Sequence, residues 1–189
     1  MAPGRTFVGV VEPADYRALP PNGDDRRRRL EQLYADHAAA VFGFARRRAS
    51  WADADEIVSE TFLVAWRRLD DLPGQERPWL LGIARKALAN RMRTETRQRR
   101  VQLRLAAEPP SAQTTDAYVI DGSVHAALAR LSAADRDALT LLAWDELTPA
   151  EVAVVLDCTR AAAYVRIHRA RRRFAIALAA IRSAEGDHE

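Results

Sequence analysis

Residues 148–174 of this 189-residue chain, TPAEVAVVLDCTRAAAYVRIHRARRRF, carry the start signals of two successive helices. Thr148, the proline after it and Glu151 three residues later form a capping-box pattern, so a short helix begins here. A turn of three residues, 157–159, follows, and its threonine can cap a second helix that runs to about residue 181. Two helices joined by such a turn form a helix-turn-helix.

The second of these helices has two contrasting faces. Ala163, Ile167, Ala170 and Phe174 recur at steps of four, three and four residues, which places one narrow apolar stripe toward a core. The opposite face is polar and basic, so it fits a DNA major groove, although an amphipathic helix packed on its own domain is an alternative on this motif alone.

The helical pattern extends outward from this motif toward the N-terminus, and nothing in the chain alternates as a strand does. Three amphipathic helices are predicted from Leu30 to about Arg93, with breaks at residues 49–51 and 70–74. Residues 123–147 predict two further short helices, the second capped by Ser132. The expected fold class is therefore all-α, with two small helical domains, a helical bundle and a helix-turn-helix domain, joined by a flexible linker.

Composition sets the expected boundaries of these domains. Proline and glycine are frequent near the N-terminus and again around residues 109–122, where helical periodicity is lost. The expected segments are a flexible N-terminal arm at 1–25, a helical domain at 26–96, a linker at 97–122, a helix-turn-helix domain at 123–182 and a C-terminal tail at 183–189.

Composition also excludes several classes of protein. With 48% hydrophobic and 29% charged residues, the chain is expected to be globular, and charged residues interrupt every apolar run before it could span a membrane. The single cysteine, Cys158, allows no intrachain disulfide, and the four histidines show no ligand spacing. No Gly-rich phosphate loop is present. We therefore expect a cytoplasmic protein that is not an enzyme, with no metal site and no cofactor.

The charges are segregated along the chain. The formal net charge is only +3, but arginines cluster at 26–29, 46–48, 91–104 and 166–173. Acidic residues gather in one short segment, at 53–60. Separate basic and acidic faces suit a polyanion on one side and a basic protein on another, and solvated helix faces are the simpler alternative.

Four segments resemble the extracytoplasmic-function (group 4) sigma factors of the sigma-70 family. Residues 53–66, DADEIVSETFLVAW, are similar to the family helix that docks on the clamp coiled coil of RNA polymerase. Residues 77–85, RPWLLGIAR, resemble its promoter-melting segment. Residues 131–136 and 166–173, LSAADR and RIHRARRR, resemble its promoter-recognition module. The resemblance implies an RNA polymerase sigma factor that directs core polymerase to promoters and assists DNA melting.

The resemblance also assigns roles to individual residues. The residues expected to bind polymerase are Asp53, Asp55, Glu56, Ser59, Glu60 and Arg67. Those expected to bind the melted −10 element are Arg77, Trp79, Arg85, Lys86, Asn90, Arg91 and Arg93. The −35 element would be read by Arg160, Tyr164, Arg166 and His168, with Arg169, Arg171 and Arg172 mainly on phosphates. Phe62 and Trp66 lie on an apolar stripe, where a core role is favoured over a contact with polymerase. Trp79 also lies on an apolar stripe, and a core role for it is at least as well supported as a stacking one.

Several positions depart from the family pattern. Lys86 stands where an asparagine is frequent, and Asp157 replaces the glycine of the helix-turn-helix bend. The three alanines at 161–163 and Tyr164 replace the more frequent Gly-Thr-Val and Lys. Aspartate enters the left-handed backbone region more readily than most residues, so Asp157 can still make the bend.

The implied partners are core RNA polymerase, through its clamp coiled coil and its flap, promoter DNA, and an anti-sigma factor. Two other classes stay open on the sequence alone. A helix-turn-helix regulator that acts without being a polymerase subunit would explain residues 123–181, and a helical adaptor would need no nucleic acid at all.

Overall fold

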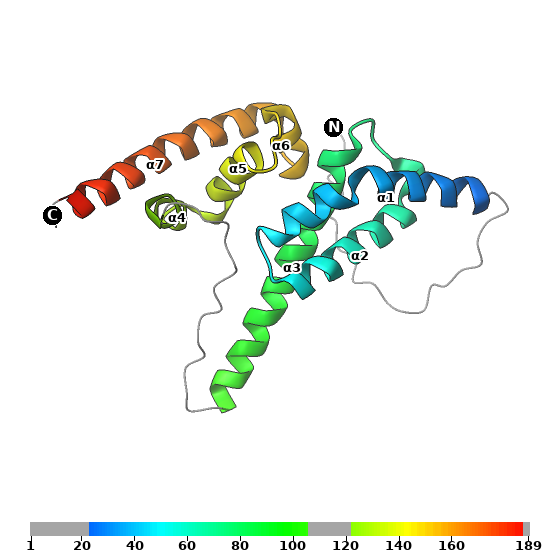
Figure 1. Ribbon diagram of the computed structural model, residues 1–189, viewed down its shortest axis with the longest axis horizontal. Helices are drawn as coiled ribbons and strands as arrows, with labels where there is room; N and C mark the ends of the chain where they lie inside the picture. Colours follow the sequence, from blue (N-terminus) through cyan, green and yellow to red (C-terminus); the bar gives the residue numbers. More distant parts are fainter. Residues whose placement is uncertain (1–22, 106–121, 187–189) are drawn as a thin grey trace, which may run out of the picture.

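The computed structural model describes residues 23–105 and 122–186, and every regular element within these ranges is helical (Figure 1). The first domain contains α1 (Gly23–Arg46), α2 (Trp51–Arg67), a short 3₁₀ turn (Leu69–Asp71) and α3 (Glu76–Leu105). The second contains α4 (Gly122–Ala129), α5 (Ala133–Ala143), α6 (Pro149–Val155) and α7 (Arg160–Gly186). The predicted all-α class with two helical domains is confirmed.

Hydroxyl side chains cap four of the helices at their N-termini. Ser50 accepts a hydrogen bond from the Asp53 amide before α2, and Ser132 does the same for Asp135 before α5. The capping box predicted at Thr148 is complete, because Glu151 also accepts from the Thr148 amide at 2.8 Å. Thr159 caps α7 through the amide of Ala162 at 3.2 Å. Local sequence therefore sets where these elements begin.

The first domain buries one face of each of its three helices. From α1 the core takes Leu33, Val41 and Phe44, and from α2 it takes Ile57 and Phe62. The core role favoured for Phe62 is therefore confirmed. Tyr34 of α1 is half exposed and lays its ring against Phe62 of α2, with the ring centroids 4.7 Å apart.

Helix α3 is longer than its apolar stripe predicted. The periodic pattern fades near Arg93, but the helix continues to Leu105, so its last residues occupy the first part of the expected linker. Arginine, glutamine and leucine are good helix formers, so a polar composition does not by itself end a helix. The N-terminal arm and most of the expected linker lie outside the described residues.

The second domain is organised around α7, which packs on α4, α5 and α6. Ala163, Ile167 and Ala170 are buried, as their spacing predicted. Asp157, in the turn before α7, has a φ of 54°. The left-handed bend expected at this aspartate is thus confirmed.

The two domains pack against each other, with α6 lying on α3 (Figure 1). One continuous cluster of buried apolar residues includes Leu80, Leu81 and Ala84 of α3 together with Val152 and Val155 of α6. Among the described helices, none is long and apolar enough to span a bilayer.

Candidate nucleic-acid and protein interfaces

Helix α2 presents an acidic face, defined here as Asp55, Glu56, Ser59 and Glu60, to solvent. The Ser59 hydroxyl donates to the Asp55 carbonyl at 3.0 Å, so it is satisfied within the helix. The carboxylates of Asp55 and Glu60 contact no cation in the part of the chain that the structure describes. Arg67 extends this exposed face by about two turns toward the helix end. Uncompensated carboxylates on a surface suit a basic partner.

Arg91 of α3 binds Asp53 and Glu56, two of the acids predicted to contact polymerase. Its guanidinium forms ion pairs with Asp53 and Glu56, and its Nε lies 3.5 Å from Glu95. The hydrogen bond with Glu56 raises the pKa of Arg91, and the hydrogen bond with Ser50 lowers the pKa of the Asp53 carboxyl. Arg91, predicted to hold a DNA strand, is thus engaged in fixing α2 to α3.

Leu63 is an exposed apolar residue beside the acidic face, and sequence reasoning missed it. Its relative exposure is 46%, whereas the adjacent Phe62 is 6% exposed. Leu63 follows Ser59 and Glu60 by four and three residues, so it lies on the same side of the helix as both. The available signal was this spacing to both Ser59 and Glu60, since Phe62, one residue earlier, shares only the spacing to Ser59.

Three of the predicted −10 residues contact the second domain. The Arg77 guanidinium donates to the carbonyl of Asp145 at 2.7 Å. Arg85 pairs with Asp137 at 2.8 Å, and Lys86 pairs with Asp157 at 3.0 Å. The remaining exposed members of the set, Asn90 and Arg93, hydrogen-bond to each other.

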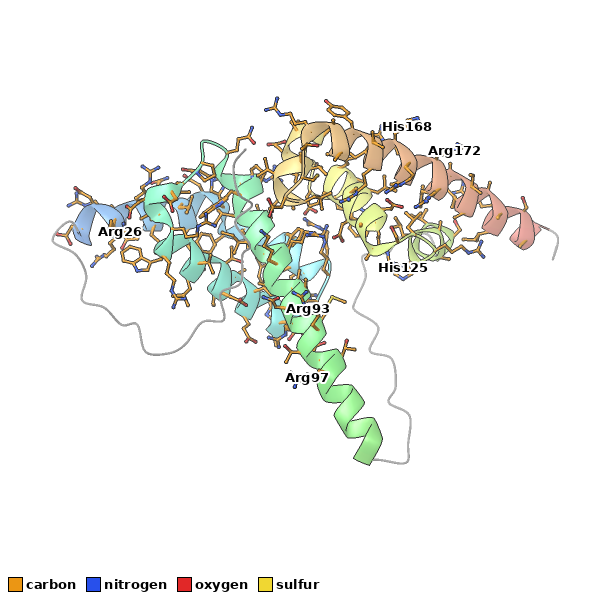
Figure 2. The ribbon with its side chains drawn as sticks, turned by 180° about the vertical axis from the view of Figure 1, so that it is seen from behind. Arg26, Arg93, Arg97, His125, His168 and Arg172 are labelled. Carbon is orange, nitrogen blue, oxygen red and sulfur yellow. The ribbon has the colours of Figure 1, made fainter. Side chains whose placement is uncertain are left out.

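The basic surface continues along the projecting half of α3. Figure 2 shows Arg93 and Arg97 on this part of the helix, beyond the packed core. Arg97 is exposed and was not among the predicted residues, because the helix was expected to end before it. Trp79 is half-buried and packs against the core, with the Arg68 guanidinium 5.9 Å from its ring centroid. This placement favours the core role for Trp79 over a stacking one.

Helix α7 carries the predicted reading face. Figure 2 shows His168 and Arg172 on its outer side, and Arg160 and Tyr164 precede them at helical spacing. All four are exposed, Tyr164 by 58%. The side chains of these four form no ion pair or hydrogen bond within the described ranges, so the face is open. Arg166 is half-buried at its border.

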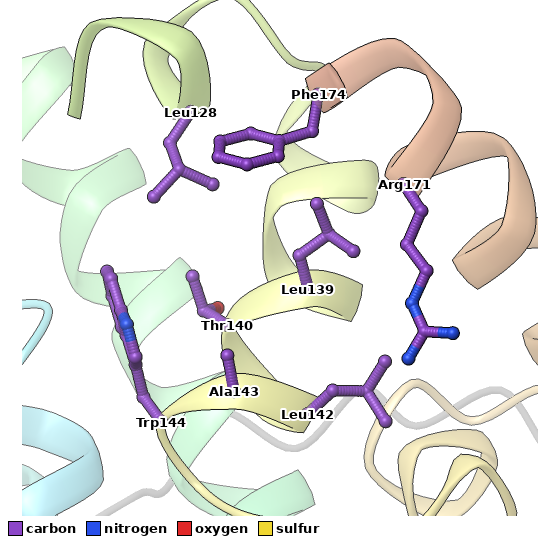
Figure 3. Close-up of a pocket in the computed structure, with 8 residues that line it drawn as sticks. All are labelled: Leu128, Leu139, Thr140, Leu142, Ala143, Trp144, Arg171 and Phe174. Atoms are coloured by element: carbon purple, nitrogen blue, oxygen red, sulfur yellow. The ribbon is translucent and has the colours of Figure 1, made fainter. Parts of the chain in front are cut away.

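Arg169 and Arg171 have placements that differ from this open face. Arg169 lies 3.3 Å from Asp135, a carboxylate with no exposed surface, which fixes α7 on α5. Arg171 lines a groove of about 320 Å³ in the second domain (Figure 3). The groove is mostly apolar, and its other lining residues are Leu128, Leu139, Thr140, Leu142, Ala143, Trp144 and Phe174. No group of three potential ligands is placed to hold a metal ion in residues 23–105 and 122–186.

Two family models match the chain, one on each domain. Residues 33–98 match the model of sigma-70 region 2, and residues 121–174 match the model of sigma-70 region 4. They follow each other in that order along the chain.

Curated relatives match across both regions. The chain is 31% identical to the RNA polymerase sigma factor CnrH of Cupriavidus metallidurans over 177 residues, which is 85% of this chain and 92% of that protein. It is 28% identical to the RNA polymerase sigma factor NccH of Alcaligenes xylosoxydans xylosoxydans, over 74% of this chain and 81% of that one.

Solved structures give a matching fold. CnrH in complex with the cytosolic domain of CnrY aligns over 82% of this chain and 90% of that chain, with 27% identity and a TM-score of 0.55. The sigma factor RpoE of Bartonella quintana, in complex with the anti-sigma factor NepR, aligns over 82% and 97%, with 22% identity and a TM-score of 0.54.

Proposed function

The chain belongs to the sigma-70 family, as an RNA polymerase sigma factor of the extracytoplasmic-function type, and we propose that its charged surfaces divide between core polymerase and two promoter elements. Sigma factors are regulatory subunits of RNA polymerase. The observation that carries the function is the match of both sigma-70 regions, in order, to the two domains that bear these surfaces. The place of action is the cytoplasm, with the polymerase.

The acidic face of α2, with Leu63 beside it, is the proposed docking site for the clamp coiled coil of core polymerase. Asp55 and Glu60 carry no competing partner in the described structure, so their charge is available to a basic surface. Exposed ion pairs contribute only about 0.2–1 kcal/mol each, so an apolar anchor is needed as well. Leu63 supplies it. Asp53 and Glu56 are bound to Arg91, and these ion pairs fix the geometry of the docking site.

The first part of α3 is the proposed site for the melted −10 strand. Lys86, Asn90 and Arg93 are spaced by four and three residues and so share one side of the helix, and Arg85 and Arg77 lie nearer its N-terminus. Cationic side chains along a helix can follow the phosphates of a single strand. Trp79 stabilises the domain beneath them.

The outer face of α7 is the proposed reader of the −35 element. Arg160 and Tyr164 lie near the helix N-terminus, where a recognition helix reaches base edges in the major groove. Farther along, Arg172 is placed for phosphate contact, and His168 lies between the two kinds of contact. Because Arg169 is bound to Asp135, its main role is to hold the helix in place.

The apolar groove of the second domain is the proposed site for the polymerase flap. Its lining is largely leucine, tryptophan and phenylalanine, which suits the apolar face of a partner helix. An anti-sigma factor is a further proposed partner, because the solved structure of CnrH contains CnrY and that of RpoE contains the anti-sigma factor NepR. Such a protein would block initiation by covering these same surfaces.

Reconstituted transcription tests the function directly. Core polymerase from the source organism is incubated with genomic DNA fragments, with and without the purified chain. We expect discrete run-off products that require both core and chain, and their start sites identify the promoter. If core gains no start-site selectivity from the chain, or if the chain binds the same promoters specifically without core, the proposal fails.

A further inference from the structure

Val165 is an exposed apolar residue on the outer side of α7, and it is not among the residues predicted to read DNA. Its relative exposure is 65%, whereas Ala163 and Ile167, two residues away on either side, are buried. Two residues along an α-helix correspond to a rotation of about 200°. Val165 therefore points almost directly away from the core of its domain.

The turn of α7 before Val165 carries only small side chains on this side. Ala161 and Ala162 precede Val165 by four and three residues, and both are exposed. Side chains of a helix lean toward its N-terminus, so Val165 lies over these two alanines. Together the three residues are called the apolar patch of α7. Because neither alanine extends beyond its Cβ, the helix is narrow here, and a partner surface can come close enough to touch the short valine side chain.

The apolar patch lies among the residues proposed to read the −35 element. Arg160 and Tyr164 are exposed and adjoin the patch in the sequence. Arg172 follows Val165 by seven residues, so it lies on the same side of the helix two turns farther along, on the outer side of α7 that Figure 2 shows. A recognition helix that places Arg172 on phosphates and its first turns in the major groove thus brings Val165 to the base-pair edges.

The chemistry of the major groove limits what an apolar patch can contact there. Base edges in this groove present hydrogen-bond donors and acceptors, and thymine adds a C5 methyl group. Valine and alanine side chains form no hydrogen bond, so packing them on a donor or acceptor would leave that group desolvated and unpaired, which is unfavourable. Packing them on the thymine methyl group instead buries apolar surface on both sides.

We infer that Val165, with Ala161 and Ala162 beside it, packs against the C5 methyl group of a thymine in the −35 element and makes the protein select thymine at that position. The inference rests on the −35 role proposed above for α7 and deepens it. Arg160 and Tyr164 read hydrogen-bonding groups of neighbouring base pairs. The apolar patch reads a group that forms no hydrogen bond.

Deoxyuridine tests this contact, because it lacks only the C5 methyl group of thymidine and keeps the same pairing edge. Core polymerase carrying the purified chain first selects its −35 sequence from duplexes in which this region is randomised. Each thymine of the selected sequence is then replaced by deoxyuridine, one per duplex, and binding of the polymerase complex is measured by fluorescence anisotropy. We expect at least one replacement to weaken binding about fourfold, which is the effect of one buried methyl group.

Val165→Ala identifies the side chain that makes the contact. We expect this variant to bind the thymine duplex about fourfold more weakly than the parent chain does, and to lose the difference between thymine and deoxyuridine at the sensitive position. The matched control is Ile176→Ala, an exposed apolar residue of the same helix, at 62% exposure and three turns farther from the patch. It should keep both the affinity and the fourfold difference. Circular dichroism and affinity for core alone should be unchanged in both variants.

The inference is overturned if the selected −35 sequence requires no thymine, or if no deoxyuridine replacement weakens binding. It is equally overturned if Val165→Ala keeps the full fourfold difference, because another residue then contacts the methyl group. Weaker core binding by Val165→Ala with an unchanged −35 preference would also overturn it and assign Val165 to a protein contact. The proposed function fails in a different way, since core then gains no start-site selectivity from the chain and no −35 sequence is selected.

Discussion

The guanidinium of Arg173 lies 2.6 Å from Oδ2 of Asp135, a carboxylate that the second domain buries completely. Arg169, one turn earlier on α7, reaches the other oxygen of the same carboxylate. Asp135 therefore holds two turns of α7 against α5, and the position of the proposed reading face depends on this one acid.

Asp135→Asn should destabilise the second domain by about 2 kcal/mol, because hydrogen bonds between charged groups are lost at a buried position while the two arginines can still be hydrated. Urea unfolding followed by circular dichroism at neutral pH measures the change. The control is Asp71→Asn, an exposed carboxylate in the first domain that should leave the unfolding midpoint unchanged. Equal effects of the two substitutions would contradict the role given to Asp135.

The contribution of Asp135 should also depend on pH. Burial alone would raise the pKa of this carboxyl, but hydrogen bonds from Arg173, Ser132 and Arg169 outweigh it and hold the pKa below the ordinary value of 3.8. A carboxyl with a lowered pKa in the folded state stabilises it above pH 3.8 and loses that contribution as the pH falls further. The stability difference between the parent chain and Asp135→Asn should therefore be constant near neutrality and shrink below that pH.

Reversing two charges on the acidic face, Asp55→Arg together with Glu60→Arg, should lower affinity for core polymerase at least about 30-fold, because each position exchanges attraction for repulsion. Surface plasmon resonance with immobilised core measures it. The matched control is Glu31→Arg with Asp36→Arg, which makes the same change in net charge on exposed positions of α1. Normal affinity in the test variant, or an equal loss in the control, would place the docking face elsewhere.

Leu63→Ser should weaken core binding by about 1.5 kcal/mol, or roughly tenfold, since a leucine buried on binding contributes about that much. The substitution should leave the melting temperature nearly unchanged, because the side chain is already half exposed. Ile176→Ser on α7, at 62% exposure, is the control for a general loss of surface apolarity. An unchanged dissociation constant for Leu63→Ser would show that binding does not bury this residue.

Arg160→Ala and Arg172→Ala should have different effects on promoter binding by the polymerase complex. Loss of a base contact at Arg160 should cost about 1–3 kcal/mol and relax the sequence preference at one position of the −35 element. Loss of a phosphate contact at Arg172 should weaken all promoters alike and reduce the slope of log affinity against log salt by about 1. Binding of a randomised −35 library at several salt concentrations separates the two, and identical profiles would contradict the proposed orientation of α7.

The local features of this fold could be predicted from the sequence. The helix starts at Ser50, Ser132 and Thr148 depend on side chains within three residues of the cap, so the signal is contained in a short window. The left-handed Asp157 and the apolar stripe of α7 are local in the same sense. A spacing of three and four residues identifies the buried side of a helix wherever the partner lies.

The pairings between the domains could not be predicted in this way. Arg48 and Asp145 are separated by 97 positions, and nothing near either residue identifies the other. The local sequence around each residue predicts only an exposed charge in a polar cluster. For the same reason, the helical pattern placed Arg77, Arg85 and Lys86 on the correct helix, but no local pattern indicated that the second domain contacts them.

The length of chain between the end of α3 and the start of α4 limits the maximum separation of the two proposed DNA-binding domains. The helix carries the chain outward to Leu105, and 16 residues then connect Leu105 to the start of α4 at Gly122. Such a tether reaches at most about 55 Å when fully stretched, at about 3.4 Å per residue. Successive base pairs of a duplex are also about 3.4 Å apart, so each residue deleted from the tether removes about one base pair of maximum reach. The number of residues in this tether thus sets an upper bound on the length of promoter spacer that the protein tolerates.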